Sequence, residues 1–173
     1  MNAAGITLRL PTAADTDFFW RYRSDARLAA AEGRPVAATR QAATAFLAKL
    51  LAGQAAGTSR TWLITVAEAP VGLIGAWGFD PARTTCELAY GLLPAFQGRG
   101  LMTAAVTAVV AQLWHQEPTL VNLDCYTGAA NRPSRRLLER LGFALIGQLT
   151  EPNQLDQPTE MVQYRRLRPD RLS

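Results

Sequence analysis

The segment 62–114 constrains the fold of this chain most strongly. Three strand-like runs lie at 62–66, 71–79 and 84–92. Only short turns separate these runs, and consecutive strands on short turns predict an antiparallel meander. The stretch that follows, 98–114, is rich in Ala and Val, which predicts one long and well-buried helix. A strand therefore passes into a helix through a turn that contains Gly98 and Gly100.

Further elements are predicted on both sides of this segment. Additional strands are expected at 6–10, 120–126, 143–149 and 161–167, the last two as a hairpin across a polar loop. Additional helices are expected at 13–23 after the N-cap Thr12, from Thr39 to about Leu51 with Gly53 ending it, and from about Pro133 to Leu141 with Gly142 ending it. The order β-α-α-β-β-β-α-β-α-β-β indicates a mixed α/β sheet of about seven strands with about four helices.

Composition narrows the class of protein. A length of 173 residues predicts a single domain, 1–173. The net charge of +4 is too small and too scattered for a nucleic-acid surface, although arginines, which make up all the basic residues except Lys49, suit phosphate or carboxylate ligands. Two cysteines, Cys86 and Cys125, form no CxxC motif, and with His115 as the single histidine we expect no metal site. No apolar run approaches the roughly 18 residues of a membrane span and no signal peptide is evident, so we expect a cytoplasmic protein that binds neither membrane nor nucleic acid.

The turn before the long helix is the candidate binding site. The first N–H groups of a helix have no partner within it and lie at the positive end of its dipole. Glycines let a ligand approach the backbone, so the N–H groups of Gly98 to Thr103 form a candidate phosphate or pyrophosphate site. The turn is not a P-loop, because no Gly-Lys-Ser/Thr follows, and it lacks the third glycine of a dinucleotide fingerprint. A Gly-x-Gly alone is also compatible with a connection that binds nothing.

Two blocks of residues resemble one family. Gln97-Gly98-Arg99-Gly100-Leu101-Met102 resembles the Q/R-x-x-G-x-G/A acyl-CoA pyrophosphate motif of the GNAT N-acetyltransferase superfamily. The block from Asn131 through Ser134 and Glu139 to Phe143 is similar to the N-x-x-S…E-x-x-G-F block of the branch that acetylates ribosomal-protein N-termini, such as the ribosomal-protein alanine N-acetyltransferases. The resemblance covers about Ile6 to Leu167 and implies a mostly antiparallel GNAT-like sheet with acetyl-CoA as the acyl donor.

The chain departs from this family pattern at a few positions. Met102 stands where Gly or Ala is commonest, Gly91 replaces a usual aromatic residue, and Ala104 replaces a usual Glu. The loop 148–160 matches little of the pattern, which leaves the acceptor open between a protein N-terminus and a small-molecule amine.

The resemblance also implies how the donor is held. The strand 84–92 would splay from its neighbour across the sheet, and the pantetheine arm would pair with backbone near its end. Asn131 would hydrogen-bond that arm, and Arg135 or Arg136 would meet the 3′-phosphate unless both belong to a solvated helix face. The expected donor-binding residues are Leu92, Leu93, Gln97, Gly98, Arg99, Gly100, Leu101, Met102, Thr103, Asn131 and Arg136.

Catalytic roles are implied for two side chains. Glu87 is the expected general base, directly or through water, because partial burial raises the pKa of a glutamate; the alternative is a cross-strand partner for an arginine. Ser134 is the expected acid or hydrogen-bond donor to the leaving thiolate; the alternative is a capping hydroxyl in the first helical turn. Tyr90 and Tyr126 are alternative phenol donors, and a backbone N–H near Leu93 would polarise the thioester carbonyl.

The sequence thus predicts an acetyl-CoA-dependent N-acetyltransferase acting on a primary amine, as a monomer or a homodimer. One rival is a non-catalytic acyl-CoA-binding sensor, which would bind the donor without releasing thiol in the presence of amines. The other is a nucleotide-binding enzyme that uses the same turn for a different diphosphate, and it would prefer NAD or ATP to CoA.

Overall fold

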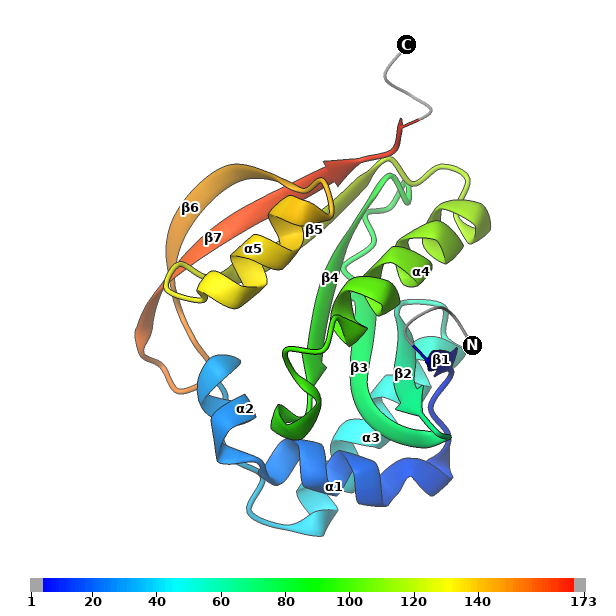
Figure 1. The fold of residues 1–173 in the computed structure, drawn as a ribbon, viewed down its shortest axis with the longest axis vertical. Coiled ribbons are helices and arrows are strands. Elements are labelled where there is room, and N and C mark those ends of the chain that lie inside the picture. The colour runs from blue at the N-terminus through cyan, green and yellow to red at the C-terminus, as the bar shows by residue number, and fades with distance from the viewer. Residues whose placement is uncertain (1–4, 170–173) are drawn as a thin grey trace.

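The computed structural model describes residues 5–169 and contains one open sheet of seven strands in the order β1-β2-β3-β4-β5-β7-β6 (Figure 1). The strands are β1 (Ile6–Arg9), β2 (Arg60–Val66), β3 (Ala69–Trp77), β4 (Thr85–Leu92), β5 (Asn122–Gly128), β6 (Ala144–Pro152) and β7 (Pro158–Leu167). The α-helices are α1 (Thr16–Ser24), α2 (Ala26–Ala31), α3 (Arg40–Ala55), α4 (Leu101–Gln116) and α5 (Arg132–Arg140). Neighbouring strands are antiparallel except β4 and β5, which are parallel, so the predicted mixed and mostly antiparallel sheet is confirmed.

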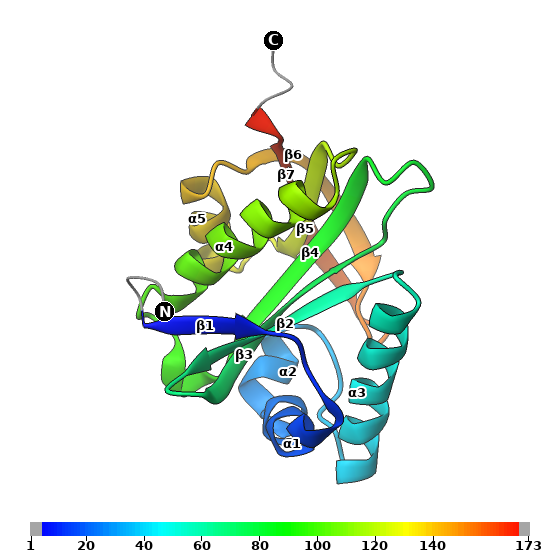
Figure 2. The same cartoon turned by 90° about the vertical axis from the view of Figure 1, so that its right-hand side faces the viewer.

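Helices cover both faces of the sheet. Helices α4 and α5 lie on one face, and α1, α2 and α3 lie on the other (Figure 2). The long helix α4 is apolar on most sides and buries Leu101, Met102, Ala105, Val106, Val109, Val110 and Leu113 in the main core. Burial of one such aliphatic side chain contributes about 1.5–3 kcal/mol, so the start of α4 is held firmly against the sheet.

A second core cluster holds α1 on the opposite face. Phe18, Phe19 and Tyr22 are spaced for one side of a helix and pack with Leu47 of α3 and Leu63 of β2. This packing fixes the segment after α1, which lies beside the end of β4.

Three predicted boundaries are wrong for local reasons. Helix α3 continues through Gly53 to Ala55, because the left-handed residue that follows the helix is Gly57, at φ +69°. The long helix begins at Leu101 rather than at Gly98, since Gly98 and Gly100 both have positive φ.

The predicted helix at 13–23 starts as a 3₁₀ turn at Ala13–Asp15, in which Asp15 accepts hydrogen bonds from the backbone and side chain of Thr12. A further helix, α2, adds to the four helices that the sequence predicts. Asp25 caps it by accepting hydrogen bonds from the N–H groups of Arg27 and Leu28.

Candidate active site

Strands β4 and β5 separate halfway along their length. Their pairing runs from Thr85 and Asn122 to Leu88 and Cys125 and ends there. Strand β4 nevertheless stays paired with β3 as far as Leu92, and β5 stays paired with β7 to its last residue. The facing edges of the two strands therefore diverge beyond Leu88 (Figure 1), which is the splay expected from the sequence.

Backbone groups of β4 line this splay. The N–H of Leu93 donates to the carbonyl of Val71 in β3 at 2.9 Å. Because antiparallel pairs alternate, the backbone groups of Leu92 and Tyr90 face the other way, toward β5. The Leu92 carbonyl accepts from the side-chain amide of Gln97 at 3.0 Å, which leaves the Leu92 N–H and the Tyr90 backbone for a ligand.

This geometry changes the roles expected for Leu93 and Gln97. Leu93 uses its N–H on Val71 and its carbonyl on the N–H of Phe96, so the available backbone N–H near Leu93 is that of Leu92 and not that of Leu93 itself. The reason is that Leu93 has already turned toward β3 at the start of a 3₁₀ turn, Pro94–Phe96. Gln97 clamps this turn to the end of β4 through its side chain, and this contact positions the loop.

The start of α4 presents unpaired amides. The first hydrogen bond of the helix runs from the Ala104 N–H to the Gly100 carbonyl. Within residues 5–169, the N–H groups from Gly98 to Thr103 have no hydrogen-bond partner. The side chains of Leu101 and Met102 are buried in the core, so these amides are held rigidly at the surface. Such an arrangement suits a phosphate or pyrophosphate group.

The two glycines of this turn adopt a left-handed backbone conformation. Gly98 and Gly100 have φ values of +74° and +73°, and a Cβ atom on either would meet no protein atom within 4 Å. Their left-handed conformation is the reason for glycine here, because other L-residues are strained in it.

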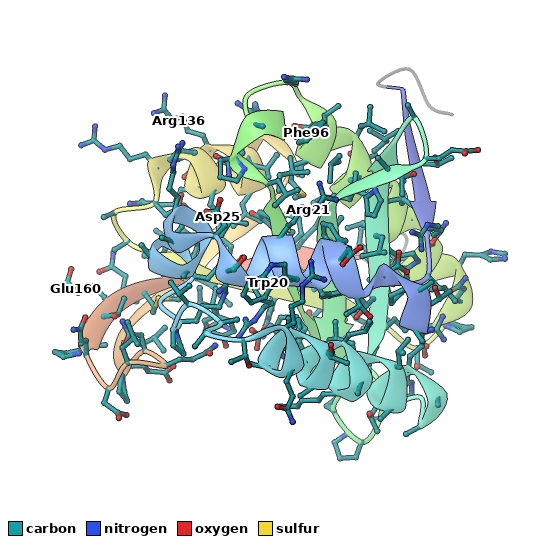
Figure 3. All side chains as sticks on the ribbon, turned by 90° about the horizontal axis from the view of Figure 1, so that it is seen from below. Trp20, Arg21, Asp25, Phe96, Arg136 and Glu160 are labelled. Atoms are coloured by element: carbon teal, nitrogen blue, oxygen red, sulfur yellow. The ribbon has the colours of Figure 1, made fainter. Side chains whose placement is uncertain are left out.

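Arginines lie near both helix starts. The Arg99 guanidinium lies 5.4 Å from the centre of the Phe96 ring. Arg135 donates to the hydroxyl of Tyr164 and to the carbonyl of Ala129, so it fastens α5 to the sheet. Arg136 lies exposed on α5, and its side chain forms no hydrogen bond or ion pair with the other residues of 5–169 (Figure 3).

The first turn of α5 reaches across to β4. The Asn131 side chain caps the helix by accepting from the Ser134 N–H at 3.2 Å. The capping role considered for Ser134 therefore belongs to Asn131. The Ser134 hydroxyl instead lies 3.0 Å from the Tyr90 hydroxyl, beside the splay, and burial raises the pKa of Tyr90.

Glu87 lies on the opposite face of β4 from Tyr90, since the two are an odd number of residues apart. Its cross-strand neighbour is Asp124, whose carboxylate is held by Arg165 at 2.6 and 2.7 Å and by Gln163. Glu87 itself has no hydrogen-bond or ion-pair partner among residues 5–169, so the alternative of an arginine partner is not found. Burial, and then the charges of Asp124 and Glu151, raise the pKa of Glu87, as a general base working near neutral pH requires.

Two features of this face were missed by sequence reasoning. Glu87 lines a cavity of about 570 Å³ together with Glu151 of β6, a residue that the sequence places only in a polar loop. Gly91 leaves room for the α1 residue Tyr22, because a Cβ at Gly91 would lie 1.9 Å from the Tyr22 hydroxyl. That hydroxyl donates to Glu32, and the phenol of helix α1 occupies the space beside position 91 of strand β4.

Neither membrane-spanning nor metal-binding features emerge from the described part of the chain. No helix within residues 5–169 combines the length and apolar character needed to cross a membrane. In the same range, no group of three or more His, Cys, Asp or Glu side chains is arranged to hold a metal ion.

Comparison with known proteins decides the family. The family model for an acetyltransferase (GNAT) domain matches residues 6–144. The chain belongs to the GNAT acetyltransferase family. This membership confirms the predicted class of acetyl-CoA-dependent acetyltransferase and favours catalysis over a non-catalytic sensor. Among proteins of curated function, no sequence matches the chain.

Solved structures share the fold of this GNAT protein. The ribosomal-protein-S5-alanine acetyltransferase from Vibrio fischeri has a TM-score of 0.81 at 16% identity, over 96% of this chain and 94% of the other. RimJ from Mycobacterium smegmatis, in complex with a CoA-disulfide, has a TM-score of 0.82 at 18% identity, over 98% and 86%. A GNAT-family acetyltransferase from Bacillus anthracis has a TM-score of 0.80 at 18% identity, over 94% of each chain. The neighbours include the branch that the block at 131–143 resembles.

Proposed function

We propose that this enzyme binds acetyl-CoA in the splay between β4 and β5 and transfers the acetyl group to a primary amine on the Glu87 face of the sheet. One observation carries the proposal: the unpaired edge of β4 leads directly to the unpaired amides at the start of α4. The pantetheine arm pairs with the backbone of Tyr90 and Leu92, and the pyrophosphate binds the amides of Gly98 to Thr103.

Further groups complete donor binding. The side-chain amide nitrogen of Asn131 bonds the pantetheine arm, since only the oxygen of that side chain is used in capping. Arg136, and Arg99 at the turn, bind phosphate oxygens, because a guanidinium matches phosphate geometry.

The reaction is a direct displacement at the thioester. The amine nitrogen attacks the carbonyl carbon, so that a C–N bond forms and the C–S bond breaks. Glu87 takes the proton that the ammonium or attacking amine loses and passes it to solvent. Ser134 donates a hydrogen bond to the departing thiolate, which becomes the CoA thiol by taking up the second proton that the acceptor nitrogen loses. The Tyr90 hydroxyl forms a hydrogen bond with the Ser134 hydroxyl. The products are the N-acetyl amine, CoA and one proton.

The acceptor comes from one of two sources, a peptide N-terminus or a small-molecule amine. The similarity in fold to a ribosomal-protein-S5-alanine acetyltransferase supports the peptide. The loop between β6 and β7 contacts the turn after α2, where the Gln154 N–H donates to the Gly33 carbonyl at 2.9 Å.

The test is thiol release from acetyl-CoA with a panel of peptides and small amines, with the acetylated product identified by mass spectrometry. We expect turnover with at least one acceptor. Glu87→Gln should lower kcat about a hundredfold, with the Kd for CoA unchanged within about twofold by calorimetry, since Glu87 lies on the face away from the donor groups. Binding of CoA without acetylation of any acceptor would show a sensor, and preference for NAD or ATP over CoA would overturn the donor site.

A further inference from the structure

The cavity beside Glu87 is formed by a curled hairpin. The pairing of β6 with β7 shifts register between Leu145 and Gly147, and a bulge of this kind bends and twists a strand. The bend brings Glu151 of β6 near Glu87 of β4, although β5 and β7 separate the two strands in the sheet. All three side chains line the same cavity, and the charge of Glu151 contributes to raising the pKa of Glu87 and of Tyr126.

Negative charge in this cavity is not balanced by the protein. Asp124, the cross-strand neighbour of Glu87, is neutralised by its bidentate contact with Arg165. Glu87 and Glu151 have no cationic partner among residues 5–169. Two carboxylates therefore face a cavity whose other lining is apolar or neutral, from Tyr126, Leu149, Met161 and Gln163.

We infer that the acceptor carries a second positive charge besides its reacting amine, and that Glu151 binds this second charge. The inference rests on the proposed function, in which Glu87 takes the proton of the reacting amine. The apolar side chains of Leu149 and Met161 are cross-strand neighbours. They lie against the segment of the acceptor that joins its two positive charges.

The complementary chemistry is a short apolar arm with a cation at each end. An α,ω-diamine has this form, and so does a peptide N-terminus followed by a lysine or arginine side chain. A neutral arm of the same length fills the same space but leaves the charge of Glu151 unbalanced, so it binds less tightly.

The test compares matched acceptors on the full-length enzyme. The small-molecule pair is 1,5-diaminopentane and 1-aminopentane. The peptide pair is Ser-Lys-Ala-Ala and Ser-norleucine-Ala-Ala. We expect about a tenfold preference for the cationic member of one pair in kcat/KM, falling as salt rises. The pair with the larger preference identifies the source of the acceptor.

A charge-matched pair of variants locates the effect. Glu151→Gln should remove most of the preference in kcat/KM for the cationic member of the pair. Glu160→Gln removes the same charge from the opposite face of the same hairpin, where the residue is exposed (Figure 3), and should keep the preference.

Binding separates failure of this inference from failure of the proposed function. Calorimetry with the CoA-bound enzyme should show tighter binding of the cationic member of one pair in the absence of turnover, and weaker binding after Glu151→Gln. Equal binding within both pairs, or equal losses in the Glu151 and Glu160 variants, would overturn the inference. Binding selectivity without acetyl transfer to any acceptor would support it and refute the proposed function.

Discussion

Glu87 is the residue whose surroundings most affect the proposed chemistry. Half-burial disfavours its charged form first, and the carboxylates of Asp124 and Glu151 add repulsion. Removal of one negative neighbour must favour the ionised form, so Glu151→Gln should lower the pKa of Glu87. Carboxyl ¹³C NMR as a function of pH measures this directly. Glu160→Gln should leave the pKa of Glu87 unchanged. An unchanged or raised pKa of Glu87 in the Glu151 variant would contradict the electrostatic coupling of Glu151 to Glu87.

Ser134 and Tyr90 form one hydroxyl pair, and in the proposed mechanism Ser134 is the member that meets the leaving thiolate. Asn131 already caps α5, which leaves the Ser134 hydroxyl available for the reaction. Ser134→Ala should therefore lower kcat about tenfold, the value of a lost hydrogen bond of about 1.4 kcal/mol, without raising KM for acetyl-CoA. Tyr90→Phe should lower kcat less. The reverse order in steady-state kinetics would make Tyr90 the donor.

At the scale of elements, the start of α4 depends on one left-handed residue. Gly100 has φ +73° and open space around its Cβ position, so an alanine there clashes with nothing but costs about 1–2 kcal/mol of backbone strain. Relief of that strain would turn the first amides of α4 away from the pyrophosphate. We expect Gly100→Ala to weaken CoA binding about tenfold in calorimetry.

Gly57 provides the matched control at the end of α3. It has φ +69° and equally open space, but it lies away from the splay. Gly57→Ala should lower the free energy of unfolding by a similar amount, about 1–2 kcal/mol in urea, and leave the Kd for CoA unchanged. Equal Kd values for CoA in both variants and in the wild type would show that the start of α4 does not bind the donor.

Prediction from sequence succeeded where neighbouring residues decide the outcome. The strands β2, β3 and β4 and the helix α4 follow from unbroken patterns and short turns, and the glycine turn follows from backbone conformation alone. The position of Glu151 was not predictable, because it depends on a bulge between Leu145 and Gly147 and on the curvature of the hairpin. The role of Leu93 depends on a single hydrogen bond to Val71, which moves the ligand-facing backbone to Leu92 and Tyr90.

For the whole molecule, a buried carboxylate ties together elements far from the site. Glu117 follows α4 and accepts hydrogen bonds from Arg60 of β2 and from Arg83 in the turn before β4. The contact with Arg83 in particular lowers the pKa of Glu117, which is well buried. Glu117→Gln should lower the free energy of unfolding by about 1–3 kcal/mol at pH 7.

The pH dependence of this effect has a definite sign. A carboxylate with a lowered pKa in the folded state stabilises the fold above the ordinary glutamate pKa of about 4.3, and that stabilisation is lost as pH falls through the folded value. Urea unfolding should thus show wild type and Glu117→Gln converging in acid. A gap that stays constant down to pH 3, or a loss as large in Glu160→Gln, would contradict this assignment.

Titration of the ¹⁵N-labelled enzyme with CoA shows whether the donor lies in the splay with its pyrophosphate on α4. We expect the largest amide shifts at Gly98 to Thr103, accompanied by Leu92 and Tyr90, and little shift at Leu93. Saturable binding that leaves the amides of 98–103 unmoved and shifts another surface instead would contradict this placement of the donor.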